Sequence, residues 1–298
     1  MGFQGRRKVS RISNICIMCG EEVQFWFESV NSGIGPTNTY KVFRCKNCST
    51  TQISPIPENL EPFYSNYHFI PKRQAWIRAV KSNKNRLRVL NSVLPKKGLI
   101  LDVGAGIGSF SAALEQSGFQ TISVERDESC RRNIATKTKG LVYSDLSAFN
   151  PLEAGTPDAL TLWHVFEHLS NPGDFFTELV DKLPNLSKIV IEVPNPMSWQ
   201  FSLMKKNWPH LDVPRHIFLP SEVGIRVFAL KFGFDVATIS NRDRKSWSAF
   251  SISNFRAKPH ESDFIRKCRR LIQLIITPIF VVEPKTKAAT HIFLLTKR

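Results

Sequence analysis

The feature that most constrains the fold is a glycine-rich turn between an apolar run and a helix-forming stretch. Residues 99–110 read Leu-Ile-Leu-Asp-Val-Gly-Ala-Gly-Ile-Gly-Ser-Phe, with glycines at 104, 106 and 108. A short apolar run that stops at glycine is typical of a buried strand. Glycine also permits turns and close approaches that a Cβ would forbid. The segment therefore predicts a strand, a turn open to a ligand, and a helix.

Apolar runs and helical patterns alternate along the chain on both sides of this turn. Strands are expected at 98–103, 121–125, 141–143, 158–164, 188–193, 235–240 and 291–296. Helices are expected at about 107–117, 127–137, 173–183 and 221–232. This alternation predicts an α/β fold, with a doubly wound parallel sheet between two layers of helices.

The spacing of the glycines separates classes of nucleotide site. It reads G-x-G-x-G, with Ser at 109 and Phe at 110, whereas dinucleotide sites favour G-x-G-x-x-G. The Lys-Ser/Thr pair of a phosphate-binding P-loop is missing as well. A pyrophosphate or triphosphate ligand is therefore disfavoured.

Acidic residues follow three successive strands. Asp102 precedes the glycines, Glu125 ends the next strand 21 residues after Gly104, and Asp145 follows the third strand. A carboxylate at the Glu125 position accepts hydrogen bonds from both hydroxyls of a ribose, and Asp145 is placed to reach an adenine amino group. For each acid taken alone, a helix cap or a solvated loop residue is usually the better explanation. Three of them at one edge of the sheet indicate a nucleoside site.

Together these motifs resemble the class I S-adenosylmethionine-dependent methyltransferases over residues 98–296. The resemblance rests on LDVGAGIGSF, Glu125, Asp145-Leu146, DALTLWHVFEHL at 158–169 and IEVPNP at 191–196, in that family's order. It implies a Rossmann-like, seven-stranded sheet with an antiparallel last strand at 291–296, and S-adenosylmethionine as the cofactor.

The resemblance also implies roles for individual residues. The methionine end of the cofactor would be lined by Asp102, Gly104, Ala105 and Gly106. Glu125 would bind the ribose, Asp145 and Leu146 the adenine, and His164 would lie beside the sulfonium.

Four of the six cysteines form two C-x-x-C pairs separated by 25 residues: Cys16, Cys19, Cys45 and Cys48. Short alternating stretches at 23–27 and 40–44 lie between them. Two such pairs can close a tetrahedron around Zn²⁺, so the pattern predicts a small zinc ribbon with a closed, structural metal site. Redox or disulfide pairing is the alternative, and a reducing compartment disfavours it. Cys130 and Cys268 stand alone and are expected to be packed thiols.

A closer branch fits as well. The chain is similar to bacterial methyltransferases of type 23, which join an N-terminal ribbon to a WHVFEHL segment and a later Pro-Arg-His, here within 211–216. That branch implies modification of sugars, cell-surface glycans or small metabolites. The expected organisation is a ribbon at 1–55, a connector and one basic amphipathic helix at 56–95, and the methyltransferase domain at 96–298.

The last domain carries an insert at about 241–290. It holds the basic segment 266–270 and an apolar run of twelve residues, 271–282. The pair resembles an interfacial membrane anchor, and a helical lid on the sheet explains it equally well.

The acceptor side of the site is expected around His164–His168 and His216. The H-x-x-E-H pattern at 164–168 matches a zinc peptidase signature, but that signature needs a helix and this segment begins at a strand end. His168 and His216 are candidate general bases, with Glu167 and Arg215 orienting the acceptor or binding an anionic substrate. Hydrogen bonds between loops are the alternative role.

The formal net charge of +16 suits a nucleic acid, an anionic membrane face or a phosphorylated substrate, or only a solvated basic surface. The first residues lack the apolar stretch of a secretory signal, and no run reaches the roughly 20 apolar residues of a membrane span. A cytoplasmic location is expected, with peripheral contact at the inner face of the membrane left open.

Three functions follow. The first is methylation of a small acceptor: a sugar, a nucleotide sugar, or a glycan or lipid precursor. The second is an RNA methyltransferase that uses the ribbon and the basic surface, although the Asn/Asp-Pro-Pro-aromatic motif of base N-methylation is missing after residue 163. The third is a non-catalytic adaptor, which the intact cofactor motif disfavours.

Overall fold

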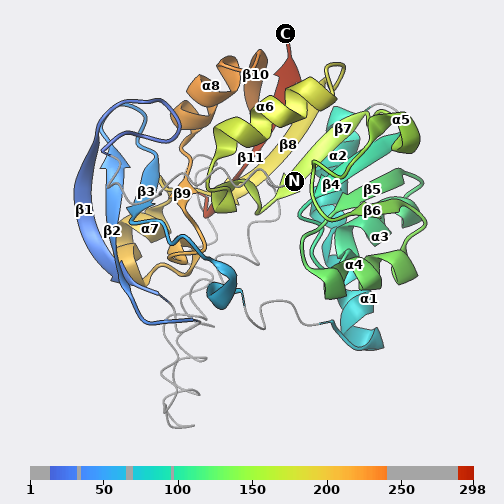
Figure 1. The fold of residues 1–298 in the computed structure, drawn as a ribbon, viewed down its shortest axis with the longest axis horizontal. Coiled ribbons are helices and arrows are strands. Elements are labelled where there is room, and N and C mark those ends of the chain that lie inside the picture. Colours follow the sequence, from blue (N-terminus) through green and yellow to red (C-terminus); the bar gives the residue numbers. More distant parts are fainter. Residues whose placement is uncertain (1–13, 32–34, 65–69, 95–96, 240–287) are drawn as a thin grey trace, which may run out of the picture.

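A computed structural model describes residues 14–31, 35–64, 70–94, 97–239 and 288–298, and within them the chain forms two sheets (Figure 1). The larger sheet has seven strands and carries the glycine turn at the end of a central strand. The smaller sheet has four strands and contains the cysteine pairs.

The seven-stranded sheet has the order β10-β11-β8-β7-β4-β5-β6. Its strands are β4 (Leu99–Val103), β5 (Gln120–Val124), β6 (Leu141–Tyr143), β7 (Ala159–Trp163), β8 (Lys188–Pro194), β10 (Phe234–Ile239) and β11 (Thr290–Lys297). The pairs from β8 to β6 are parallel, and β11 is antiparallel to both of its neighbours. The predicted Rossmann-like sheet with an antiparallel last strand is confirmed.

The register brings the ends of the central strands to one edge. Val103, the last residue of β4, is paired with Val124 of β5 and with Leu162 of β7. The glycine turn, Glu125 and His164 each follow one of these strands directly. The turn therefore lies between the segments that leave β5 and β7, at the edge where open α/β sheets bind ligands.

Helices cover both faces because alternate residues of each strand point to opposite sides. Leu101 packs in the core that includes Phe176 of α6 (Pro172–Lys182) and Phe228 of α8 (Glu222–Leu230). Ile100 packs in the core with Leu114 of α3. The other helices and 3-10 turns are α3 (Ser109–Gln116), α4 (Glu128–Lys137), α5 (Pro151–Ala154), α7 (Trp199–Met204), Glu61–Phe63, Phe166–His168, Lys205–Asn207 and Pro209–Leu211.

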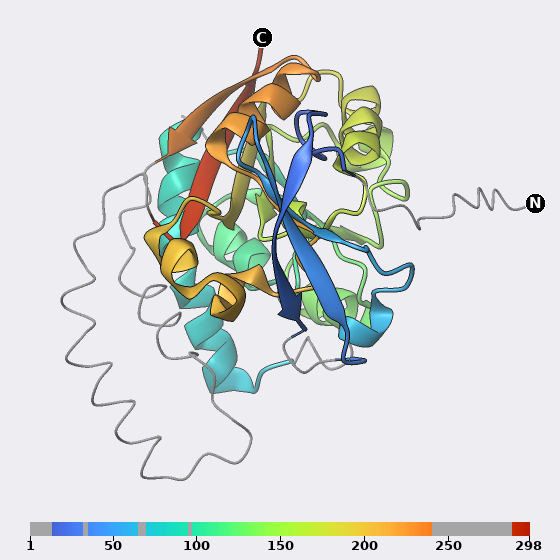
Figure 2. The ribbon, with the colours of Figure 1, turned by 90° about the vertical axis from the view of Figure 1, so that its left-hand side faces the viewer.

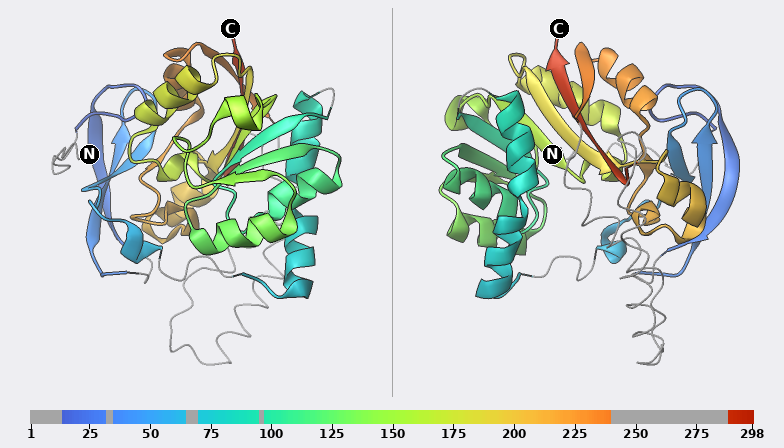
Figure 3. Two further views of the ribbon diagram at one scale, coloured as in Figure 1. Left: turned by 45° about the vertical axis from the view of Figure 1, so that its right-hand side comes forward. Right: turned by 180° about the vertical axis from the view of Figure 1, so that it is seen from behind.

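The single basic helix expected before the sheet is divided into α1 (Arg73–Ser82) and α2 (Lys84–Val93). Asn83 causes the break. Its backbone N–H donates to Val80 and its side-chain amide donates to the carbonyl of Ala79, 3.0 Å away, so the side chain competes with the regular helical bonds. Both helices pack against α3, and Figure 3 shows them in teal on the face seen from behind.

The smaller sheet has the order β1-β2-β3-β9, from β1 (Val23–Val30), β2 (Thr39–Cys45), β3 (Thr51–Ser54) and β9 (Phe218–Leu219). The strands expected between the cysteine pairs are confirmed. The fourth strand comes from the methyltransferase part of the chain and pairs with β3 in antiparallel register. Figure 2 shows the blue ribbon strands beside the orange segments that carry β9 and α7.

An aromatic core joins the ribbon to the larger domain. Trp208 is 2% exposed and stacks on Phe201 at 4.7 Å between ring centroids, in the same cluster as Tyr40 of β2. The shared sheet and this core connect the two parts of the chain across the predicted boundary near residue 55, and the boundary itself stays a prediction.

The insert predicted at 241–290 lies outside the described residues except at its last three positions, as does Cys268. Its basic and apolar segments, and the predicted membrane contact, therefore stay predictions. No helix among the described residues is long and apolar enough to cross a membrane.

Candidate functional site

The glycine turn is locked between β5 and the segment that follows β7. The Gly104 N–H donates to the carbonyl of Val124 at 2.7 Å. Gly104 has φ +69°, and a Cβ at this position would lie 2.3 Å from Cγ2 of Val165. Only glycine fits both the left-handed backbone and the close contact. The turn therefore contacts both the end of β5 and the His164–His168 segment that follows β7.

Glu125 lies beside the turn, as the sequence predicts. The N–H of Gly106 donates to its Oε2 at 2.7 Å, and the N–H of Asp127 donates to its Oε1 at 2.9 Å. A carboxylate has about four lone pairs, so both oxygens retain acceptor capacity for a second donor. The geometry orients Glu125 rigidly at the end of β5, and its role toward a ribose stays a prediction.

Asp102 is buried beneath the turn. The hydroxyl of Ser111 donates to one carboxylate oxygen at 2.8 Å, and the hydroxyl of Thr161 donates to the other at 2.9 Å. Burial raises the pKa of Asp102 to about 6 against the effect of these two hydroxyls. The carboxyl thus ties β4 to β7 and to α3. Its predicted contact with the cofactor stays a prediction.

Asp145 and Leu146 follow β6 and differ in burial. Asp145 is exposed and accepts hydrogen bonds from the hydroxyls of Ser147 and Ser144 and from the N–H of Ala148. These bonds, led by the one from Ser147, lower its pKa to about 2. Leu146 is 5% exposed and packs in the main core. Their predicted contact with adenine is not tested by this geometry.

On the other side of the turn, the chain leaves β7 through a strained residue. His164 has φ +58°, a region that non-glycine residues occupy rarely and that is concentrated at functional sites. The backbone N–H of His164 donates to the carbonyl of Glu192 at 2.9 Å. The next residues form a single 3-10 turn, Phe166–His168. The α-helix that a peptidase H-x-x-E-H site requires is not formed here.

His164 and Glu167 form a buried ion pair. Nδ1 of His164 lies 3.1 Å from Oε1 of Glu167, whose side chain is fully buried. Burial opposes ionisation of Glu167, but the hydrogen bond from His164 and the nearby histidines lower its pKa to about 2. Burial likewise opposes protonation of His164, and Glu167 and Glu192 outweigh it, so the pKa of His164 is raised.

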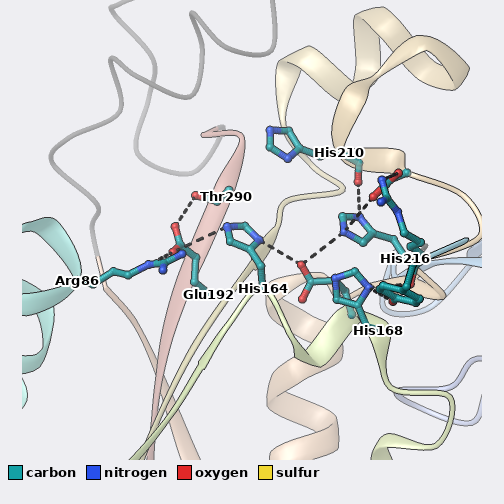
Figure 4. Close-up of polar contacts among 11 residues, drawn as sticks. Arg86, His164, His168, Glu192, His210, His216 and Thr290 are labelled. Atoms are coloured by element: carbon teal, nitrogen blue, oxygen red, sulfur yellow. Dashed lines mark hydrogen bonds and ion pairs between the residues drawn. The ribbon is translucent and has the colours of Figure 1, made fainter. Parts of the chain in front are cut away.

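Glu192 of β8 and Arg86 of α2 extend the His164–Glu167 pair, as Figure 4 shows. Oε2 of Glu192 lies 3.8 Å from Nε2 of His164 and 3.4 Å from Nε of Arg86. Thr290 donates from its hydroxyl to Oε1 of Glu192 at 3.2 Å. No motif in the sequence pointed to a role for Glu192 or Arg86. A charged residue inside the apolar run Ile191-Glu-Val193 was the available signal.

His168 and His216 come together although 47 residues separate them. Their ring centroids are 4.7 Å apart. Nδ1 of His168 lies 2.8 Å from the carbonyl oxygen of Arg215, and Nδ1 of His216 lies 2.7 Å from that of His210. A carbonyl oxygen only accepts, so both Nδ1 atoms carry the proton and both Nε2 atoms keep a lone pair when the rings are neutral.

Burial, helped by the neighbouring His216, lowers the pKa of His168 to about 4, so this ring is neutral near pH 7. Nε2 of His216 lies 3.9 Å from both Oε1 of Glu167 and Oδ2 of Asp212. Tyr64, from the connector, places its hydroxyl 2.9 Å from Nδ1 of His168. The sequence analysis assigned no role to Tyr64 or Asp212.

Arg215 is oriented by Asp212. Its Nη2 lies 2.7 Å from Oδ1 of Asp212, and both side chains are largely buried. The structure thus places Glu167, His168, Arg215 and His216 in one cluster, as the sequence predicts. Their catalytic roles, and anion binding by Arg215, stay predictions.

The cysteines form a second cluster. The four Sγ atoms of Cys16, Cys19, Cys45 and Cys48 lie within 4.8 Å of one another. Two of the separations are 3.6 Å and 3.4 Å, close to the roughly 3.8 Å edge of a tetrahedron with Zn–S bonds of about 2.3 Å. The donor set and its shape fit Zn²⁺.

Cys130 is a packed thiol as predicted, and burial raises its pKa to about 12.

Comparison with known proteins agrees with this architecture. A family described as "Methyltransferase domain" matches residues 73–239. An uncharacterized methyltransferase of Alkaliphilus oremlandii (strain OhILAs) is 33% identical over 75 residues, which are 25% of this chain and 35% of the relative. The match thus spans about a third of that relative's length.

Solved structures with a similar fold include a SAM dependent methyltransferase from Archaeoglobus fulgidus. It is 22% identical, with a TM-score of 0.49, over 73% of this chain and 94% of that one. Magnesium protoporphyrin IX methyltransferase from Synechocystis PCC 6803 with bound SAH is 14% identical, with a TM-score of 0.46, over 77% and 89%. Because its family profile covers more than half of its residues, the chain belongs to the methyltransferase-domain family of the class I S-adenosylmethionine-dependent methyltransferases.

Proposed function

We propose that the protein transfers the methyl group of S-adenosylmethionine to a hydroxyl of a small acceptor. The acceptor class is a sugar, a nucleotide sugar, or a glycan or lipid precursor. The observation that carries this proposal is the contact between His168 and His216, which lie close to ionised Glu167 in a cluster that begins two residues after Val165, the residue packed against Gly104.

The cofactor side is formed by the turn and the acids beyond it. The backbone at Gly104, Ala105 and Gly106 approaches the methionine portion without steric hindrance from side chains. Glu125 is held by the Gly106 N–H and accepts from the ribose hydroxyls. Asp145 and Leu146 lie at the adenine end. This assignment places the sulfonium toward the segment that begins at His164, because Val165 contacts Gly104.

The residues on the side of the methyl acceptor include the base that takes its proton. Methyl transfer is an in-line displacement in which the S–CH₃ bond breaks as the O–CH₃ bond forms, and the acceptor hydroxyl must lose its proton. A neutral imidazole with a fixed tautomer suits this task. His168 and His216 are oriented by the carbonyls of Arg215 and His210 and both present an Nε2 lone pair, and the nearby Glu167 carboxylate stabilises the proton that is gained. Arg215 binds an anionic group of the acceptor.

Transfer of labelled methyl from S-adenosylmethionine into a cell extract tests the proposal. Wild type is expected to label the small-molecule or glycan-precursor fraction, and His216→Gln is expected to label it at least about 100-fold more slowly. His291→Gln changes a buried histidine of β11 outside this cluster and serves as the matched control. Equal rates for wild type and His216→Gln would contradict the assigned catalytic side.

The alternative is an RNA acceptor. The net charge of +16 favours it, as does the ribbon, where the guanidinium of Arg44 lies 5.1 Å from the ring centroid of Trp26, a pairing suited to stacking on bases. In the same labelled extract, this alternative predicts label in the RNA fraction and RNA retention that weakens steeply with salt. Label confined to the small-molecule fraction contradicts it.

A further inference from the structure

Three potential ligand atoms converge beside the glycine turn. One oxygen of Glu167 and one nitrogen each of His168 and His216 lie within 4.8 Å of one another. The first two residues belong to the 3-10 turn after β7, and His216 lies just before β9. The tertiary fold, not the local H-x-x-E-H spacing, therefore creates a set of two imidazoles and one carboxylate.

The two histidines are held in the orientation that metal ligands adopt. Each donates its Nδ1–H to a backbone carbonyl, at 2.8 Å for His168 and 2.7 Å for His216. Metal-binding histidines almost always donate their other ring N–H to a carbonyl or carboxylate, which fixes the tautomer and directs the free nitrogen at the cation. In both rings, the nitrogen left for a ligand is Nε2.

Glu167 provides a second, independent indication of a bound cation. Its side chain is fully buried, and Oε2 has no hydrogen-bond partner among the described residues. The other oxygen is held by His164 at 3.1 Å. A buried carboxylate oxygen without a partner is costly. A cation bound at this oxygen would remove that cost, with His164 as the outer group that orients the carboxylate.

The spacing of the donors also favours a bridging ion over direct hydrogen bonds. Nε2 of His216 lies 3.9 Å from Oε1 of Glu167 and from Oδ2 of Asp212, too far for a hydrogen bond. Ligands at about 2.0–2.2 Å from Zn²⁺ lie roughly 3.3 Å apart in a tetrahedron. For the His216 nitrogen and this Glu167 oxygen, coordination of one ion requires a contraction of about 0.6 Å, and all three donor atoms already lie within 4.8 Å of one another.

We propose that Glu167, His168 and His216 bind one divalent transition-metal cation, and that the acceptor oxygen occupies a further coordination position. Three protein ligands leave such a position open, as in catalytic metal sites, and imidazole with carboxylate suits Zn²⁺, Fe²⁺ or Co²⁺. Cation binding by these three residues does not depend on the proposed methyl transfer. The role of the open coordination position does rest on it.

In that role, the cation lowers the pKa of the coordinated hydroxyl. The hydroxyl proton passes to water, the methyl group moves from sulfur to oxygen, and the neutral thioether of S-adenosylhomocysteine leaves. With the cation bound, the two histidines act on the acceptor through it; without the cation, they act as the direct bases of the proposed function.

Titration of the full-length protein with Co²⁺ tests the cation site separately from the cysteines. The thiolates give an intense ligand-to-metal charge-transfer absorption, whereas a site of two imidazoles and one carboxylate gives only weak d–d bands. Wild type is expected to bind one Co²⁺ beyond the equivalent that develops the charge-transfer absorption. Metal content after dialysis against Zn²⁺, measured by mass spectrometry, is expected to show the same additional equivalent.

Variants locate the ion. Glu167→Gln and His216→Gln are expected to lose the additional Co²⁺ equivalent and keep the thiolate absorption. His164→Gln removes the group that orients Glu167 and is expected to weaken Co²⁺ binding about 10–100-fold. His210→Gln is the control, because it keeps the backbone carbonyl that accepts the hydrogen bond from His216, and it is expected to retain the ion. Far-ultraviolet circular dichroism checks that each variant is folded.

Binding of Co²⁺ by the cysteines alone in folded wild type overturns the inference. Retention of the additional equivalent by both Glu167→Gln and His216→Gln overturns it as well. In either case, cofactor binding and methyl transfer in the presence of a chelator show whether the proposed function survives with the histidines as direct bases.

Discussion

Two regions beside the glycine turn are constructed differently: the edge of Glu125 and Asp145, proposed to bind the cofactor, and the cluster of Glu167, His168 and His216, proposed to bind the acceptor. The edge consists of backbone and of one carboxylate at the end of each strand, and Asp145 there is exposed. The cluster consists of side chains that are largely removed from solvent, and Glu167 among them is fully buried. We infer that changes at the edge affect cofactor affinity, whereas changes in the cluster affect turnover and the dependence of stability on pH.

The largest expected effect is on turnover. His168→Gln and His216→Gln each remove one Nε2 lone pair, and general acid–base catalysis contributes roughly 10²–10⁴-fold. Single-turnover methyl transfer is expected to fall by that factor, while affinity for S-adenosylhomocysteine changes less than about twofold. A loss of cofactor affinity as large as the loss of rate would eliminate the distinction between the two regions.

The next effect is on affinity. Glu125→Ala removes the carboxylate that accepts from Gly106 and Asp127 and, as proposed, from the ribose. Hydrogen bonds to a charged group contribute about 1.5–3 kcal/mol each, so we expect cofactor affinity to fall about 10–100-fold in equilibrium dialysis with labelled S-adenosylmethionine. Glu128→Ala, an exposed acid in the first turn of α4, is the control and is expected to bind as wild type does.

The third effect is on how the free energy of unfolding depends on pH. Burial, with His164 and His216 nearby, lowers the pKa of His210 to about 3, and burial lowers that of His168 to about 4, from an ordinary value near 6.5. Below pH 6.5 the unfolded chain therefore binds more protons at these sites than the native protein. The free energy of unfolding falls as pH decreases, until the folded pKa values are reached.

Urea unfolding between pH 7 and pH 4 measures this dependence. Between pH 7 and pH 4, the free energy of unfolding of His210→Gln is expected to fall by less than that of wild type, with a difference on the order of 1–3 kcal/mol. Asp102 acts in the opposite direction, because its raised pKa of about 6 removes stability as pH rises, but it is present in both proteins and cancels in the difference. Identical slopes for wild type and His210→Gln would show that His210 is not buried as a neutral ring.

The smallest expected effect is at the exposed end of the edge. Asp145→Asn keeps the shape of the loop and weakens its hydrogen bonds from Ser144, Ser147 and Ala148. We expect a loss of cofactor affinity of about two- to fivefold, typical of an exposed hydrogen bond of about 0.5–1 kcal/mol. A hundredfold loss would mean that Asp145 is as important as Glu125.

Much of the fold is local and was predictable for that reason. The strand ranges and the two C-x-x-C turns depend on short patterns in the sequence, whereas the antiparallel orientation of the last strand was expected only from the family resemblance. The two Sγ atoms of each pair share one turn, and the antiparallel pairing of β1 with β2, in which Val23 is opposite Cys45, brings the two turns together. The division of the basic helix at Asn83 was not predicted, because it depends on a side chain competing for the carbonyl of Ala79.

The acceptor cluster was only partly predictable, because tertiary structure assembles it. The motif at 164–168 and the Pro-Arg-His segment identified Glu167, His168 and His216. The orienting contacts of Tyr64 and Asp212 were not found, since they come from the connector and from the loop before β9. Trp208 packs in the core beneath the ribbon, a position that could not be predicted from periodicity.

The account depends most on the glycine turn as a nucleoside site. Calorimetric titration of the purified protein with S-adenosylhomocysteine tests it directly, with Gly104→Arg as the variant that places a side chain against Val165. We predict saturable binding at one site in wild type and no binding to folded Gly104→Arg. Absence of binding to well-folded wild type, or unchanged affinity in the variant, would contradict the account.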